Sequence, residues 1–205
     1  MYPAMKKLEI ILSSLSIIAL CMYLLIMPYS QIITVITLSA FALMYFYLSF
    51  ALFNDFSIKQ IFKKESYRKL ELPKVIFAIA AGVVLSIIIV GIIDALLSWK
   101  SGNRKLIIGL ACILSLLIIA IVIHYITKSA FYKPILKRAA IFSAIGLTLL
   151  LLQKTTLQEI KYRHVEKTYA DKPDYLTALK KVMADPDNKE LWEEVGKEQA
   201  KYFNR

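Results

Sequence analysis

Five apolar stretches fill most of the first 152 residues, and charged residues fall mainly between them. The stretches are Leu8–Met27, Ile32–Phe53, Val75–Leu97, Leu106–Ile126 and Ala139–Leu152. A helix needs about 20 apolar residues to cross the hydrocarbon core of a bilayer, and the first four stretches meet that length. The pattern predicts an all-α fold, with a polytopic transmembrane helix bundle over residues 1–153 and a soluble helical tail over residues 154–205.

The fifth stretch leaves two topologies open. Its 14 residues would form a helix about 21 Å long, which is shorter than the ~30 Å hydrocarbon core. The stretch can cross if Lys137, Arg138 and Lys154 extend their side chains back to the interface. We favour crossing because Leu149–Leu152 is an unbroken aliphatic run. Crossing puts the tail outside, whereas a segment that does not cross leaves the tail in the cytoplasm.

Composition and charge agree with a membrane protein. Hydrophobic residues make up 58% of the chain, against about 45–50% in soluble domains. Residues 1–153 hold 15 Lys and Arg against 5 Asp and Glu, whereas residues 154–205 hold 11 against 10. The excess therefore lies in the turns, where the positive-inside rule accounts for it. A nucleic-acid-binding protein would concentrate the charge on a soluble face, so we expect no nucleic-acid partner.

The same charges predict the orientation. With a cytoplasmic N-terminus, the inner segments of the first four spans carry 12 Lys and Arg, and the outer turns carry 3. This count favours a cytoplasmic N-terminus. The Ile- and Lys-rich composition is typical of the bacterial inner membrane, so we expect a multi-pass protein of the cell membrane.

The segment 54–74 is the only long loop between spans. Its apolar residues Ile58, Ile61 and Phe62 fall on one helical face. The opposite face carries Lys59, Lys63 and Lys64. This arrangement predicts a short basic amphipathic helix that lies on anionic headgroups of the inner leaflet. A partner-binding helix is the alternative interpretation.

Small residues recur along the third stretch at about four-residue spacing. They are Ala78, Gly82, Ser86, Gly91 and Ala95. Small side chains let helix backbones approach closely in lipid, so the stripe predicts helix packing inside the bundle. Packing of this face against a second copy of the chain is the alternative.

Two ionisable residues inside the spans, Asp94 and His124, are the candidate functional groups. Asp94 lies about one turn from the outer end of its span and His124 about one turn from the inner end of its own. Roughly 20 Å along the membrane normal should separate them, so we expect no pairing. The structural interpretations are a carboxylate that reaches Lys100, Arg104 or water, and an interfacial imidazole beside Tyr125 and Lys128.

Recognisable catalytic and ligand-binding patterns are missing from the sequence. It has no G-x-S-x-G, no H-E-x-x-H and no Walker lysine loop. Cys21 and Cys112 both lie in apolar stretches and show no metal-ligand spacing. We therefore expect no enzyme activity, no catalytic residues, no cofactor and no metal site.

The tail predicts amphipathic helices. Residues 155–170 should continue the fifth span out of the membrane, and Pro173 should open a second helix. The turn 184–188 then separates that helix from a last one, with Asp187 and Glu190 in a capping-box spacing. The two helices make a helical hairpin, and the last one presents an apolar face as a candidate partner-docking surface. That face consists of Leu191, Trp192, Val195, Tyr202 and Phe203.

A short segment of the tail resembles a known repeat. Residues 188–203, with Trp192 and Gly196, resemble the first helix of a tetratricopeptide repeat. Gln199 stands where the repeat has Tyr, and no second repeat follows. The resemblance covers about 16 residues and implies partner docking, but it does not assign a family.

Three functions are compatible with this pattern. The first is a non-catalytic membrane subunit or anchor that docks a protein partner, or a second copy, through the tail or the basic loop. The second is a transporter or channel component that uses Asp94. The third is an immunity-type membrane protein that protects against a membrane-targeted toxin. We favour the first because the spans carry so few polar groups.

Overall fold

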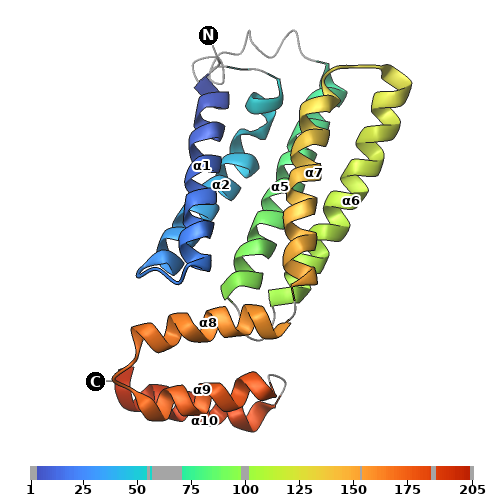
Figure 1. The fold of residues 1–205 in the computed structure, drawn as a ribbon. Coiled ribbons are helices and arrows are strands. Elements are labelled where there is room, and N and C mark those ends of the chain that lie inside the picture. The colour runs from blue at the N-terminus through green and yellow to red at the C-terminus, as the bar shows by residue number, and fades with distance from the viewer. Residues whose placement is uncertain are drawn as a thin grey trace.

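The computed structural model describes residues 4–54, 56, 71–97, 102–152, 154–185 and 188–203, and all regular structure in these ranges is helical. The described residues form five long helices and three shorter ones. Figure 1 shows the long helices side by side and the shorter ones at one end of them. The bundle helices are α1 (Ala4–Leu24), α2 (Ser30–Phe53), α5 (Leu72–Leu97), α6 (Gly102–Thr127) and α7 (Tyr132–Leu151). The tail helices are α8 (Lys154–Thr168), α9 (Pro173–Ala184) and α10 (Lys189–Phe203). The predicted all-α architecture is confirmed.

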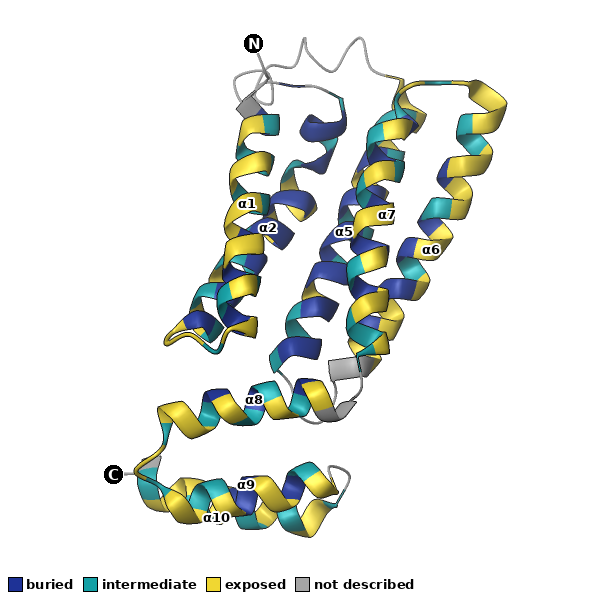
Figure 2. Cartoon of the chain, in the orientation of Figure 1, coloured by how far each residue is buried: buried dark blue, intermediate teal, exposed yellow. Residues whose placement is uncertain are grey.

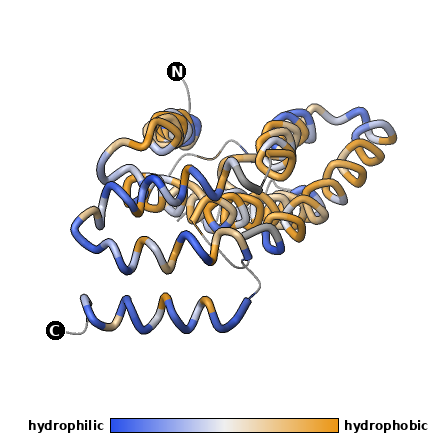
Figure 3. The backbone as a smooth tube through the Cα atoms, turned by 60° about the horizontal axis from the view of Figure 1, so that its bottom comes forward, coloured by the Kyte–Doolittle hydropathy of each residue, from blue (hydrophilic) through white to orange (hydrophobic). Residues whose placement is uncertain are grey.

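The five bundle helices have the length and composition of membrane spans. Each contains an apolar segment of 20 to 26 residues, enough to cross the ~30 Å hydrocarbon core. Their outward faces expose aliphatic side chains such as Ile17 on α1 and Ile118 on α6, at 61% and 64% exposure. Figures 2 and 3 show these exposed faces and the contrast between the apolar bundle and the hydrophilic tail. The structure therefore indicates a multi-pass membrane protein.

Helix α5 is the centre of the bundle. It packs against α2 on one side and against α6 and α7 on the other. Its side chains Leu85, Ile88 and Ile89 are fully buried, which explains why this stretch is apolar on every face. Helix α1 packs mainly on α2, so it stands at the edge of the bundle.

The stripe of small residues on α5 lies inside the bundle. Ala78, Gly82, Ser86, Gly91 and Ala95 are all buried. A Cβ atom at Gly82 would lie 2.0 Å from Ser49 Oγ and 2.5 Å from Tyr45 O, so only glycine allows α2 to approach this closely. At Gly91 a Cβ atom would lie 3.0 Å from the Leu106 Cα atom of α6. The stripe is thus occupied by helices of the same chain, which leaves it no open face for a second copy.

The fifth span is longer than its apolar run. The prediction placed it at 139–152, whereas α7 begins at Tyr132 and has 20 residues. Pro134 is accommodated because it lies in the first turn of the helix, where backbone N–H groups have no intrahelical acceptor. Tyr132 and Ile135 are buried, so the charged first turns still pack on the bundle. The helix therefore begins at Tyr132, before the predicted apolar stretch.

The tail does not continue α7. Helix α7 ends at Leu151, and Leu152 adopts an extended conformation with φ −56° and ψ 126°. Helix α8 then runs across the end of the bundle (Figure 1) and contacts α5 and α9. The predicted continuous helix out of the membrane is therefore wrong, because α8 buries Leu157 and Lys161 rather than extending into solvent.

Helices α9 and α10 form the predicted hairpin and α8 adds a third helix to it. Ala178, Leu179, Val182 and Val195 form a small buried core. The side-chain Oδ1 atom of Asn188 accepts hydrogen bonds from the backbone N–H groups of Glu190 and Leu191, at 3.0 and 3.4 Å. Asn188 therefore caps α10. Asp187, the predicted cap, lies outside the described residues.

The predicted basic helix of the loop 54–74 also lies almost wholly outside the described residues, and so does Lys100.

Candidate functional site

The tail is joined to the bundle by a buried aromatic pair. The Nε2 atom of His164 on α8 lies 2.8 Å from the backbone oxygen of Tyr23 on α1. Because a carbonyl oxygen only accepts, Nε2 carries the proton in this hydrogen bond. The two rings stack with centroids 4.6 Å apart. The Tyr23 hydroxyl donates to the backbone oxygen of Leu96 on α5 at 2.6 Å, so one tyrosine connects α1, α5 and α8.

A second contact joins α8 to the turn between α1 and α2. The Lys167 ammonium donates to the backbone oxygen of Ile26 at 2.9 Å. Ile26 and Tyr29 in this turn have φ values of 53° and 60°. A left-handed conformation is unfavourable for a β-branched residue by about 1–2 kcal/mol. The turn is therefore held in a strained shape at the point where the tail contacts it.

Asp94 lies in a charged cluster beside this junction. Its carboxylate accepts a hydrogen bond from the Lys105 ammonium of α6 at 3.0 Å. Lys161 of α8 is 6% exposed, and burial lowers its pKa to about 8, an effect that the charge of Asp94 partly offsets. The predicted partners were Lys100, Arg104 or water, whereas the structure shows Lys105; Lys100 lies outside the described residues. The carboxylate connects α5, α6 and α8 electrostatically.

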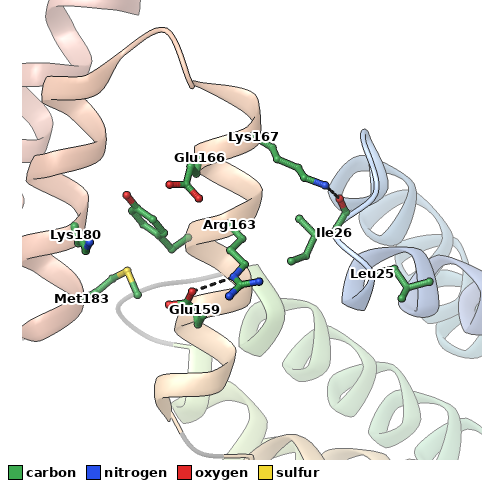
Figure 4. Close-up of a pocket in the computed structure, with 9 residues that line it drawn as sticks. Leu25, Ile26, Glu159, Arg163, Glu166, Lys167, Lys180 and Met183 are labelled. Atoms are coloured by element: carbon green, nitrogen blue, oxygen red, sulfur yellow. Dashed lines mark hydrogen bonds and ion pairs between the residues drawn. The ribbon is translucent and has the colours of Figure 1, made fainter.

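An open cleft follows the seam between the tail and the bundle. It has a volume of about 520 Å³, and Figure 4 shows its lining. Glu159 and Arg163 of α8 form an ion pair at 3.0 Å on its wall. The lining residues are Leu25, Ile26, Glu159, Tyr162, Arg163, Glu166, Lys167, Lys180 and Met183. This lining combines charges of both signs with apolar surface, a mixture that suits a polar protein segment better than a lipid chain.

A second polar cluster lies at the opposite end of the bundle. The Arg138 guanidinium of α7 donates two hydrogen bonds to the Glu9 carboxylate of α1. The Tyr45 hydroxyl of α2 donates to the same carboxylate at 2.7 Å. Arg138 also lies over the Phe53 ring, 5.2 Å from its centroid. The ion pair joins the edge helix α1 to α7, two helices that are not neighbours in sequence.

Sequence reasoning missed this cluster. It counted Asp94 and His124 as the ionisable groups of the spans and took Arg138 as a flanking residue. Glu9 was visible inside the first apolar stretch, and an isolated carboxylate in such a stretch requires a partner. Its partner could not be read from the chain because α7 was predicted to begin after Arg138.

His124 and Asp94 are not paired. The Nδ1 atom of His124 lies 2.8 Å from the backbone oxygen of Ser129, which ties the end of α6 to the following turn. Asp94 pairs with Lys105 at the start of α6. The 19 residues of α6 from Lys105 to His124 rise about 28 Å, so the two candidate groups lie at opposite ends of the bundle.

The predicted docking face of α10 is largely used within the tail. Val195 is buried, and Leu191 and Trp192 pack against the small core of the tail. The Lys172 ammonium lies over the Tyr202 ring, 5.5 Å from its centroid. The side chain of Phe203 lies outside the described part of the chain. This face is therefore a poorer candidate for partner docking than the cleft along α8.

No group of three or more His, Cys, Asp or Glu residues capable of holding a metal ion occurs among the described residues. Cys21 is exposed and Cys112 is half-buried on the bundle. Comparison with protein families, with curated proteins and with solved structures found no match to this chain. The resemblance of residues 188–203 to one repeat helix therefore identifies no family.

Proposed function

We propose that the protein is a non-catalytic membrane subunit or anchor whose bundle holds the helical tail at the membrane surface, where it docks a protein partner. The observation that carries the proposal is the buried connection from Leu96 through Tyr23 to His164. A tail joined in this way is held in one position on the bundle, and a fixed surface binds a partner with a smaller loss of conformational entropy than a free one.

The polar groups of the bundle support a scaffold role. Glu9 is bonded to Arg138 and Tyr45, and Asp94 is bonded to Lys105. Thr34 of α2 donates to the backbone oxygen of Ala19 at 3.1 Å, which joins α1 and α2. These groups connect helices to one another, as is expected where polar residues stabilise helix contacts in lipid.

The cleft along α8 is the proposed docking surface. It lies between the tail and the turn of α1 and α2, so a partner bound there would contact both parts of the protein (Figure 4). Helices α8 and α9 form its tail side, and α9 contributes Lys180 and Met183. We propose a partner segment with mixed charge and an apolar side chain, since both signs of charge line the cleft.

We propose that the N-terminus is cytoplasmic and the tail is extracytoplasmic, in a bacterial inner membrane. Five crossings put the two ends of the chain on opposite sides. Reporter fusions that work on one side only, placed after Ala130 and after Arg205, test this. We expect cytoplasmic activity at Ala130 and outside activity at Arg205. Activity on the same side at both positions would contradict the topology.

Photo-crosslinking in native membranes tests the docking surface. A photoreactive amino acid at Met183 should give one adduct with a defined protein, and Lys180→Glu in the same chain should abolish the adduct. The matched control carries the photoreactive residue at Lys197, which is exposed on α10 and does not line the cleft. Equal adducts from both positions, or none from Met183, would reject the cleft as a docking surface.

Ion flux separates the anchor from the transporter interpretation. We expect liposomes that contain the protein to show the same flux as empty liposomes, with and without Asp94→Asn. A flux that the wild type supports and Asp94→Asn abolishes would replace the anchor proposal with a transporter.

A further inference from the structure

A second surface hollow lies at the end of the bundle away from the tail, where α6 passes into α7. Its volume is about 380 Å³. It is lined by Ile121, His124, Tyr125, Lys128 and Lys133. The hollow is separate from the cleft along α8, and the proposed partner docking does not use it.

The lining of this hollow has one sign of charge. Lys128 and Lys133 are exposed, and the lining contains no carboxylate. The cleft along α8 differs, because Glu159 and Glu166 line it together with its cations. Two ammonium groups beside an imidazole and a phenol form a site that attracts an anion and offers several hydrogen-bond donors to it.

The positions of these donors are set by the end of α6. His124 is held through Nδ1 by the backbone oxygen of Ser129, which leaves Nε2 directed away from that bond. The Lys128 backbone N–H donates to the His124 oxygen at 2.8 Å, and Lys128 has a φ of 51°. Glycine is the residue that favours this helix-ending conformation. The chain instead places a lysine there, at the mouth of the hollow.

The hollow lies at the boundary between apolar and polar surface. Tyr125 and Ile126 are 83% and 74% exposed, on a helix whose other exposed large hydrophobic residues are aliphatic. Tyr at the end of a span is typical of the headgroup level of a bilayer. An occupant of this hollow would therefore have an acyl chain beside Ile121 and an anionic group beside the two lysines.

We propose that this hollow binds the phosphate of an anionic phospholipid such as phosphatidylglycerol. Lys128 and Lys133 supply the charge and hydrogen-bond donors, the Tyr125 hydroxyl supplies a further donor, and Ile121 contacts the first part of an acyl chain. Basic hollows between spans are a recurrent way of holding anionic headgroups. The positive-inside count places this site at the inner leaflet.

Native mass spectrometry of the full chain with added lipid tests the site. We expect phosphatidylglycerol to bind at least about tenfold more tightly than phosphatidylcholine. Lys128→Gly combined with Lys133→Gln should lower the phosphatidylglycerol affinity about ten- to thirtyfold, since each lysine near a headgroup contributes about fivefold or somewhat less. Lys128→Gly is chosen because it removes the charge and suits the positive φ, so the helix end should stay folded.

Lys137→Gln is the matched control. Lys137 is exposed on α7, one turn from Lys133, and does not line the hollow. We expect it to change the affinity by less than about twofold. An equal loss in Lys137→Gln would show only general attraction to a basic surface and would overturn the proposal.

Two further outcomes would overturn it. Equal binding of phosphatidylcholine and phosphatidylglycerol by the wild type would show that charge is not recognised. Displacement of the lipid by free glycerol phosphate at similar concentration would show an anion site that does not use the acyl chain. We expect glycerol phosphate to compete at least a hundredfold more weakly, because it lacks the apolar part that Ile121 contacts.

Discussion

The ion pair between Glu9 and Arg138 should respond asymmetrically to the loss of either partner. Glu9→Gln leaves the guanidinium charged and partly buried, because arginine does not release its proton. Arg138→Met leaves a carboxylate that can take up a proton and still accept the Tyr45 hydroxyl. We expect Glu9→Gln to destabilise the bundle by about 3 kcal/mol and Arg138→Met by less. Thermal unfolding in lipid nanodiscs measures both.

A double-mutant cycle completes this test. The combined variant Glu9→Gln, Arg138→Met should lose less stability than the sum of the two single changes, because no unpaired charge remains. Additive effects, or a greater loss in Arg138→Met than in Glu9→Gln, would show that the pair does not act as a unit.

Lys161 should make the stability of the tail depend on pH. Its pKa is about 8 in the folded chain against an ordinary value of 10.5. Between these two values the unfolded chain binds more protons at Lys161 than the folded chain, so stability increases as the pH rises through this window. Lys161→Met removes the buried charge. It should raise the unfolding temperature of the tail by about 2–4 °C at pH 7, and the gain should shrink towards pH 10.

The control for Lys161 is Lys197→Met, which removes an exposed lysine of α10. It should shift the unfolding temperature by less than about 1 °C at either pH. If Lys161→Met raises the unfolding temperature equally at pH 7 and pH 10, protonation of Lys161 does not cause the effect.

Single residues were predictable where the signal was local. Asp94 was placed correctly near one end of its span, since its depth follows from counting along a helix. Its partner was not predicted: the sequence pointed to Lys100 or Arg104, and the structure pairs it with Lys105, the residue that follows Arg104. The Glu9–Arg138 pair was not predictable in the same way, because 129 residues separate its partners. Only the packing of α1, α2 and α7 brings them together.

At the scale of the helix, replacing glycine by alanine should change stability in opposite directions at two positions. Gly82→Ala would place a Cβ atom 2.0 Å from Ser49 Oγ and should destabilise the α2–α5 contact by about 2 kcal/mol. Gly196 of α10 has no atom within 4 Å of an added Cβ. Gly196→Ala should therefore stabilise the tail by about 0.5–1 kcal/mol through helix propensity alone. Chemical or thermal unfolding of each variant measures the difference, and equal signs would contradict the packing.

The helix boundaries show which helix ends an apolar pattern in the sequence can and cannot locate. Four of the five apolar stretches agree with the bounds of a helix to within a few residues, because these helices end where hydropathy changes. Helix α7 begins seven residues before its apolar run. Its first turns carry Lys133, Pro134 and Arg138, which resemble a loop in sequence. They are helical because Tyr132 and Ile135 bury their side chains and Glu9 neutralises Arg138.

At the scale of the whole molecule, the position of the tail could not be read from the sequence. The amphipathic pattern predicted the tail helices but not the end of α7 at Leu151, nor the direction in which α8 runs across the bundle. That direction depends on two hydrogen bonds. His164 of α8 bonds to the backbone of α1, and Lys167 of α8 bonds to the backbone of the turn that follows α1. Neither residue stood out in the sequence, because a histidine or lysine on a mixed-charge helix is ordinary until its partner is known.

The fixed position of the tail is the property on which the proposed docking depends, and it can be measured directly. Spin labels at Met27 and Ala184, both exposed, report the distance between the α1–α2 turn and the end of α9 after Cys21→Ala and Cys112→Ala. We expect one narrow distance distribution in the wild type and a broad one in His164→Ala. That variant loses the stacked ring and the hydrogen bond to Tyr23.

Tyr23→Phe separates the fixation of the tail from the stability of the bundle. It removes the hydroxyl that donates to Leu96 but keeps the ring and the backbone oxygen that His164 contacts. The distance distribution should therefore stay narrow, while the bundle loses about 1 kcal/mol of stability. A narrow distribution in His164→Ala would show that other contacts hold the tail. A broad one in Tyr23→Phe would show that the tail follows α5 through the tyrosine hydroxyl rather than α1 through the histidine.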